Sequence, residues 1–155
     1  MNLYIMRHGM AEPYRARSDE SRLLVAEGEA QVSHVASQWL RTSPVLDFIV
    51  ASPYKRAQQT ATIVKDVLGF TGGLETNSLI TPEGDVLQVA QHLDQLASQD
   101  VLLVSHMPLV ANLLGYLTSG DPRSFGGLTT AQLVHLSGDH PAQGCMDVEM
   151  TLYPE

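Results

Sequence analysis

The chain has 155 residues, 44% of them hydrophobic and 17% charged, so we expect residues 1–155 to form a single globular domain. The 17 acidic residues outnumber the 9 basic ones and give a formal net charge of −8, which argues against nucleic acid as a partner. The apolar runs are too short to span a membrane, no secretory signal pattern is present, and the single cysteine, Cys145, cannot form an internal disulfide, so we expect a cytoplasmic protein without a membrane partner.

The first predicted element is a strand formed by the apolar run from Leu3 to Met6, which leads directly into Arg7, His8 and Gly9. A short unbroken apolar run indicates a strand that is buried on both faces, as in a parallel sheet covered by helices. Ligands of such sheets bind just beyond the carboxyl ends of the strands. Arg7 and His8 therefore occupy a position where chemistry is expected.

The rest of the chain alternates between helices and strands. Residues 10–24 lack periodicity and predict a surface loop that carries Arg15, Arg17 and Arg22. The apolar spacing then predicts helices near 27–41, 54–68, 81–98 and 108–117, and strands at 48–51, 74–77, 101–104, 129–137 and 145–152. This order predicts an α/β fold: a three-layer α/β/α sandwich with a mostly parallel central sheet and an antiparallel edge. Strict apolar–polar alternation over residues 146–152 predicts a last strand with one solvated face at that edge.

Three of the predicted buried strands end in polar groups of related character. The first ends in Arg7 and His8, the second in Ser52 with Arg56 one turn into the next helix, and the third in Ser105 and His106. In a parallel arrangement these groups and the starts of two helices meet at one sheet edge. Helix N-termini and arginine forks both suit phosphate oxygens, so this pattern predicts a site for a phosphoryl dianion.

Histidine makes the predicted site reactive. A neutral imidazole is a nucleophile that can carry a covalent phosphoryl group, and nearby Arg7 and Arg56 disfavour the imidazolium form. The same cations neutralise the charge of the transferring group. We therefore expect neither a metal nor another cofactor; a metal site at His8 and His106 would lack further ligands at a suitable spacing.

These motifs resemble the histidine phosphatase superfamily, which is also called the phosphoglycerate mutase-like family. The resemblance comes from Arg7-His8-Gly9, from the segment Ser52-Pro53-Tyr54-Lys55-Arg56-Ala57-Gln58-Gln59-Thr60, and from Ser105-His106, in that order over most of the chain. Within the superfamily, the short chain, residues 81–85 and residues 104–110 look like the SixA group of phosphohistidine phosphatases.

The resemblance implies a catalytic role for His8 as the phosphorylated nucleophile and a phosphate pocket of Arg7, Arg56 and His106. Larger members insert a helical cap, for which residues 69–82 are too short, so the fold is expected to lack a cap domain. An open pocket suits a phosphohistidine carried on a protein. Histidine phosphotransfer domains of signalling proteins and phosphocarriers are the kinds of partner that the resemblance implies.

Three assignments remain open at the level of sequence. Arg22 either contacts the phosphate from its loop or only steers an acidic substrate. Many members use a glutamate as proton donor, for which Glu83 is the candidate here and Asp85 the other one; a phosphohistidine substrate needs such an acid less, because an imidazole leaves more readily than an alkoxide. The alternative functions are a phosphomonoesterase acting on a small metabolite or on phosphoserine or phosphothreonine, and a non-catalytic phosphoprotein-binding module.

Overall fold

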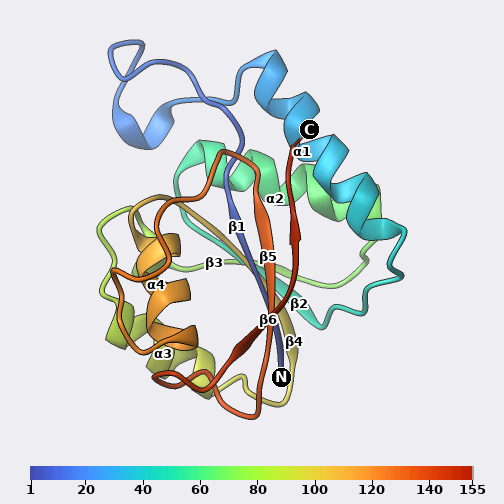
Figure 1. Ribbon diagram of the computed structural model, residues 1–155. Coiled ribbons are helices and arrows are strands. Elements are labelled where there is room, and N and C mark those ends of the chain that lie inside the picture. Colours follow the sequence, from blue (N-terminus) through green and yellow to red (C-terminus); the bar gives the residue numbers. More distant parts are fainter. Residues whose placement is uncertain (155) are drawn as a thin grey trace.

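The structure is a computed structural model that describes residues 1–154. One sheet runs through the molecule between two layers of helices (Figure 1). None of the helices in the described residues is long and apolar enough to cross a membrane. In chain order the elements are β1 (Asn2–Arg7), the 3₁₀ helix η1 (Asp19–Ser21), α1 (Ala26–Leu40), β2 (Phe48–Ala51), α2 (Lys55–Leu68), β3 (Leu74–Thr76), the 3₁₀ helix η2 (Ser78–Ile80), α3 (Val86–Asp94), β4 (Asp100–Ser105), α4 (Leu109–Thr118), β5 (Leu133–Ser137) and β6 (Asp147–Leu152).

The six strands lie in the order β3-β2-β4-β1-β5-β6. β3, β2, β4 and β1 are parallel, whereas β5 runs antiparallel to β1, and β6 runs antiparallel to β5. The predicted three-layer fold with a mostly parallel sheet and an antiparallel edge is therefore confirmed. The predicted lack of a cap is confirmed as well, since only β3 and η2 lie between α2 and α3.

The apolar side chains of the central strands pack into two separate hydrophobic cores. In β1, Leu3 and Ile5 pack toward α3 and α4, whereas Tyr4 and Met6 pack toward α1 and α2. Both faces of the strand are thus covered, which is why its sequence is continuously apolar instead of alternating. The same burial holds the carboxyl end of β1 rigidly in the middle of the sheet.

For two elements, the predicted range is clearly longer than the helix or strand that the structure shows. The helix expected over 81–98 is α3, which begins after a turn at residues 81–84. Asp85 caps its start by accepting a hydrogen bond from the Leu87 N–H, and beyond its end the chain continues in tighter i→i−3 turns. The strand expected over 129–137 begins only at Leu133. Residues 129–132 form a turn instead, in which Ala131 has a φ of 62°.

The side chains of the edge strand β6 do not alternate between two faces in the way that its sequence predicts. A β-bulge puts Glu149 between two successive pairs, Leu136 with Val148 and His135 with Met150. The extra residue reverses the in–out order. Met146, just before β6, packs into the α3/α4 core, whereas Met150 lies against the α1/α2 core, so the prediction of one apolar and one solvated face was wrong.

Candidate active site

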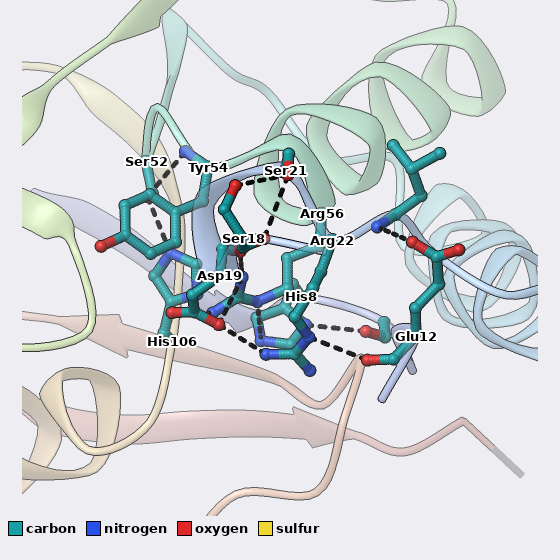
Figure 2. A network of polar contacts seen from close by, with 12 residues as sticks. His8, Glu12, Ser18, Asp19, Ser21, Arg22, Ser52, Tyr54, Arg56 and His106 are labelled. Carbon is teal, nitrogen blue, oxygen red and sulfur yellow. Dashed lines mark hydrogen bonds and ion pairs between the residues drawn. The ribbon is translucent and has the colours of Figure 1, made fainter. Parts of the chain in front are cut away.

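The carboxyl ends of β1, β4 and β2 meet at one edge of the sheet. His8 follows β1, Ser52 follows β2, His106 follows β4, and Arg56 lies in the first turn of α2. The two imidazole rings are 5.1 Å apart, and Arg56 Nε donates to His8 Nε2 at 3.2 Å (Figure 2). Residues that are far apart in the sequence are thus brought together as the strand ends predict.

The neighbours of His8 fix which of its ring nitrogens carries the proton. His8 Nδ1 lies 2.7 Å from the carbonyl oxygen of Gly9, which can only accept a hydrogen bond, so Nδ1 is the protonated nitrogen. The guanidinium of Arg56 can only donate, so Nε2 must be the acceptor. Both contacts require the same tautomer, in which Nε2 keeps its lone pair beside Arg56.

The backbone around His8 is held from two sides. The Ala131 N–H donates to the carbonyl oxygens of both Arg7 and His8, at 3.1 and 3.0 Å, which is the role of the turn that replaces the first part of the predicted strand. On the other side, the Gly9 N–H donates to Thr60 Oγ1 in α2. Thr60 Oγ1 in turn donates to the Arg56 carbonyl, so the backbone that follows His8 and the arginine share one support.

Burial keeps both histidines of the site neutral. Burial of the ring, reinforced by the charges of Arg56 and other arginines, lowers the pKa of His8 from 6.5 to about 3, although its hydrogen bond to Gly9 acts in the opposite direction. Burial also lowers the pKa of His106 to about 2, with smaller contributions from His8 and the arginines. At neutral pH both imidazoles are therefore uncharged, as a nucleophile requires.

His106 is oriented by the segment that follows β2. Its Nε2 lies 2.7 Å from Ser52 Oγ, whose hydroxyl can donate to it, and Ser52 Oγ itself accepts a hydrogen bond from the Tyr54 N–H. In that arrangement the proton of the neutral His106 ring lies on Nδ1. The Tyr54 ring packs edge-on against the His106 ring, with centroids 5.0 Å apart. Ser52 and Tyr54 belong to the Ser-Pro motif seen in the sequence, and their part in holding His106 was not predicted.

Two buried polar atoms of the site have no hydrogen-bond partner among residues 1–154. Arg7 Nη1 donates to the Leu128 carbonyl at 2.7 Å, but Arg7 Nε has no partner in the described part of the chain, and neither has His106 Nδ1. Buried polar groups without a partner are rare in folded proteins. An oxyanion that accepts hydrogen bonds would satisfy such groups, which fits the predicted phosphate pocket.

The loop after β1 contributes a third arginine. Arg22 is only 7% exposed, and its Nε donates to the Glu12 carbonyl at 2.8 Å. Its guanidinium lies over the Tyr14 ring, 4.1 Å from the centroid. The other loop arginines differ: Arg15 is exposed, and Arg17 pairs with the Glu12 carboxylate at the surface.

Asp19 in η1 joins this loop to the site, a role that the sequence motifs did not predict. Its Oδ1 lies 2.7 Å from Arg22 Nη1, and its backbone carbonyl accepts from Arg56 Nη1 at 2.6 Å (Figure 2). The acid–base spacing of three residues between Asp19 and Arg22 was a usable signal for the first contact. The contact with Arg56 spans 37 residues and had no signal in the sequence.

Comparison with known proteins agrees with this geometry. The model of the histidine phosphatase superfamily (branch 1) matches residues 3–79. The phosphohistidine phosphatase SixA of Escherichia coli (strain K12) is 33% identical over 156 residues, an alignment that covers 97% of this chain and 94% of that protein. The chain belongs to the histidine phosphatase superfamily. The resemblance inferred from the sequence motifs is confirmed.

Further relatives and solved structures are similar to this chain in sequence or in fold. A SixA homolog of Haemophilus influenzae (strain ATCC 51907 / DSM 11121 / KW20 / Rd) is 38% identical, covering 86% of this chain and 88% of that protein. The protein histidine phosphatase SixA solved in complex with tungstate superposes with a TM-score of 0.87 at 31% identity, covering 99% and 97% of the two chains. A mycobacterial glucosyl-3-phosphoglycerate phosphatase has a TM-score of 0.73 at 17% identity, with 96% and 97% covered, and shares the fold.

The two candidate proton donors of this histidine phosphatase, Glu83 and Asp85, form no hydrogen bond with His8 or His106 within residues 1–154. Glu83 is exposed and makes no side-chain hydrogen bond within residues 1–154, but its charge, after burial and other carboxylates, helps to raise the pKa of Tyr54. Glu83 is therefore within electrostatic range of Tyr54. Asp85 instead caps α3. Among residues 1–154, no three His, Cys, Asp or Glu side chains are grouped so that they could hold a metal ion.

Proposed function

We propose that this protein is a phosphohistidine phosphatase that acts through a covalent phospho-His8 intermediate. The observation that carries this proposal is the tautomer of His8: Nδ1 is bound to the Gly9 carbonyl, so Nε2 carries the lone pair. That lone pair accepts a hydrogen bond from Arg56 Nε, which must pass to a phosphoryl oxygen before Nε2 attacks phosphorus. The relatives named phosphohistidine phosphatase, which align over nearly the whole chain, support the substrate class. Tungstate, a tetrahedral oxyanion like phosphate, is bound by the related SixA structure.

In the first step, His8 Nε2 attacks the phosphorus of the substrate phosphohistidine. The new bond joins Nε2 to phosphorus, and the phosphorus–nitrogen bond of the substrate breaks, its electron pair leaving with the substrate imidazole. The substrate ring leaves neutral when its other nitrogen carries a proton. Phospho-His8 is then a cationic ring, because Nδ1 keeps the proton that it donates to Gly9.

In the second step, water attacks the phosphorus of phospho-His8. The phosphorus–nitrogen bond breaks and its electron pair returns to Nε2, which restores neutral His8 and releases inorganic phosphate. The depressed pKa of His8 favours this step, since the protein stabilises the neutral ring over the charged one. The fixed proton on Nδ1 thus makes His8 a good leaving group as well as a nucleophile.

We assign the remaining site residues to binding and charge neutralisation. Arg7, Arg56 and His106 hold the phosphoryl oxygens, and Arg22 adds positive charge from the loop. Fixed donors aimed at the developing charge are usually the largest source of catalysis in phosphoryl transfer. Because the arginines supply this charge, we propose that neither a metal ion nor another cofactor takes part. Glu83 remains the candidate proton donor for substrates with a poorer leaving group.

The open surroundings of the site favour a phosphohistidine that is displayed on another protein. Only β3, η2 and short connections lie between α2 and α3, where a cap would be inserted. A phosphotransfer domain or a phosphocarrier would present its phosphohistidine without having to be enclosed. We also infer that residues 1–155 act as one catalytic domain, because the sheet that forms the site draws on strands from residue 2 to residue 152.

The proposal is tested by measuring phosphate release from a phosphorylated histidine phosphotransfer domain, from sugar phosphates and from a phosphoserine peptide. We expect kcat/KM for the phosphohistidine protein to exceed that for the esters by at least about a hundredfold, and His8→Ala to abolish all release. Equal or better hydrolysis of the esters would identify a phosphomonoesterase. Binding of the phosphoprotein without any release would identify a binding module.

A further inference from the structure

Asp19 lies between two of the arginines that surround the nucleophile. Its Oδ1 is 2.7 Å from Arg22 Nη1, and its Oδ2 is 3.5 Å from Arg56 Nη2. Its backbone carbonyl accepts a second, shorter hydrogen bond of 2.6 Å from Arg56 Nη1. Since Arg56 Nε contacts His8 Nε2, one residue of a surface loop connects both arginines to the reactive nitrogen (Figure 2).

This arrangement differs from an ordinary surface ion pair. The guanidinium side chains of Arg22 and Arg56 are only 9% and 4% exposed, and two buried cations close together repel each other. Within residues 1–154, Asp19 supplies the only carboxylate that forms an ion pair with either of them. Partial burial of the Asp19 carboxyl acts to raise its pKa, but the hydrogen bond from Arg22 and the charge of Arg56 outweigh it, so the pKa is lowered and the group is ionised at neutral pH.

We propose that Asp19 is a positioning residue that holds Arg22 and Arg56 in place around His8, so that the phosphate cradle is already formed when substrate arrives. The 2.6 Å bond from the Asp19 carbonyl fixes Arg56, whereas the carboxylate contacts with Arg56 are long, at 3.4 and 3.5 Å. The Arg56 N–H groups that face this carboxylate can therefore readily exchange it for a phosphoryl oxygen as their hydrogen-bond acceptor. The role rests on the proposed function only in that the cradle binds phosphate.

Charge alone predicts the opposite effect of removing this side chain. A carboxylate next to a bound phosphate repels it, so on that account the loss of the carboxylate tightens phosphate binding. If Asp19 acts by positioning, the loss of its carboxylate frees the long side chain of Arg22 and removes the weaker side-chain contacts with Arg56, while the backbone carbonyl that fixes Arg56 stays. The ordering of Arg22 must then be supplied on binding, and affinity falls. The two accounts differ in the sign of the change.

The test measures binding of inorganic phosphate to the whole protein by calorimetry. We expect Asp19→Ala to weaken binding about tenfold, and Asp19→Asn, which keeps an oxygen for Arg22 Nη1, to stay within about threefold of the original protein. Glu20→Gln is the matched control, because Glu20 is the next residue of η1, is exposed and forms no ion pair within residues 1–154, so binding should be unchanged. Phosphate binding by Asp19→Ala that is equal or tighter would overturn the proposal.

A double-mutant cycle tests whether Asp19 acts through Arg22. In an Arg22→Ala background, Asp19→Ala should cost no more than about threefold, because the contact with Arg22 is already lost. A full tenfold loss in that background would contradict the proposal. Thermal unfolding of each variant checks the fold, and Asp19→Ser provides a second truncation should Asp19→Ala not fold. Because no substrate is used, these results do not depend on whether phosphohistidine is the substrate, and the two proposals can fail separately.

Discussion

Arg56 takes part both in the proposed phosphate binding and in the proposed chemistry at His8. One face of its fork contacts the reactive Nε2 of His8, and the other contacts Asp19. The charge of the guanidinium thus reinforces the burial that keeps His8 neutral, and in the proposed reaction the same group is in place for the phosphoryl oxygens. Only a planar group with several fixed donors can make these contacts at once.

The first prediction concerns replacement of Arg56. Arg56→Lys retains the positive charge but not the fork, so we expect kcat/KM to fall by about a hundredfold, or roughly 3 kcal/mol of transition-state stabilisation, with little difference from Arg56→Ala. The measurement is steady-state hydrolysis of a phosphohistidine protein. Lys55→Ala, which removes a neighbouring exposed cation of α2, is the control and should keep full activity. Full activity in Arg56→Lys would show that charge alone is sufficient.

The second prediction concerns stability in acid. The folded protein keeps His8 and His106 unprotonated down to pKa values of about 3 and about 2, whereas both have pKa values near 6.5 when unfolded. Below pH 6.5 the unfolded chain therefore binds more protons, and stability falls as the pH is lowered toward these values. Each histidine contributes up to about 1.4 kcal/mol per pH unit to this slope.

Urea unfolding at about pH 7, 6 and 5 measures this slope. Absolute stability also depends on carboxylates, so the informative comparison is with His8→Asn, which lacks one of the two titrating groups. Its free energy of unfolding should depend less steeply on pH, by about 1.4 kcal/mol per unit between pH 6 and 5. Equal slopes in the two proteins would contradict the account of a buried neutral His8.

At the scale of elements, the site depends on a close approach between α1 and the end of β1. A side chain at Gly9 would meet the Gly28 carbonyl oxygen at 2.7 Å, and one at Gly28 would lie 2.8 Å from the backbone N and carbonyl C of Met10. The Met10 carbonyl also accepts a hydrogen bond from the Val25 N–H at 3.1 Å. Helix α1 is thus packed directly on the backbone that carries His8.

The third prediction tests this packing. Gly28→Ala forces α1 away from residues 9 and 10, so we expect a loss of about 1–3 kcal/mol in the free energy of unfolding and a lower kcat in the molecules that remain folded. Gly73→Ala is the matched control, because a Cβ at that position meets nothing within 4 Å and stability should change by less than about 0.5 kcal/mol. An unchanged Gly28→Ala protein would refute the packing argument.

The arrangement of the elements also explains which features of the site can be predicted from the sequence and which cannot. The apolar runs before His8, Ser52 and His106 give the parallel strands, and parallel strands bring their carboxyl ends together, so the histidines and Arg56 were predictable. The turn at residues 129–132 was not, because its hydrogen bonds go to the backbone of Arg7 and His8, more than 120 residues away. The bulge at Glu149 likewise depends on the register with β5.

At the scale of the whole molecule, one end of the sheet carries both the rigid and the exposed parts of the site. His8 and its supports are buried at the centre of the sheet, whereas the loop from Ala11 to Leu24 lies over its edge and carries Asp19 and Arg22 (Figure 1). This loop has no periodicity, and its conformation is set by contacts with α2, so its contribution could not be read from local sequence. Only β3, η2 and short connections lie between α2 and α3, where a cap would be inserted.

The covalent role of His8 is the central claim, and trapping the intermediate tests it most directly. A phosphohistidine protein labelled on its phosphoryl group is mixed with the enzyme, the reaction is stopped in alkaline denaturant within the first turnover, and the labelled peptide is identified by mass spectrometry. We predict a transient label on His8, and neither label nor phosphate release with His8→Asn. Phosphate release without any labelled His8, or turnover by His8→Asn, would contradict the account.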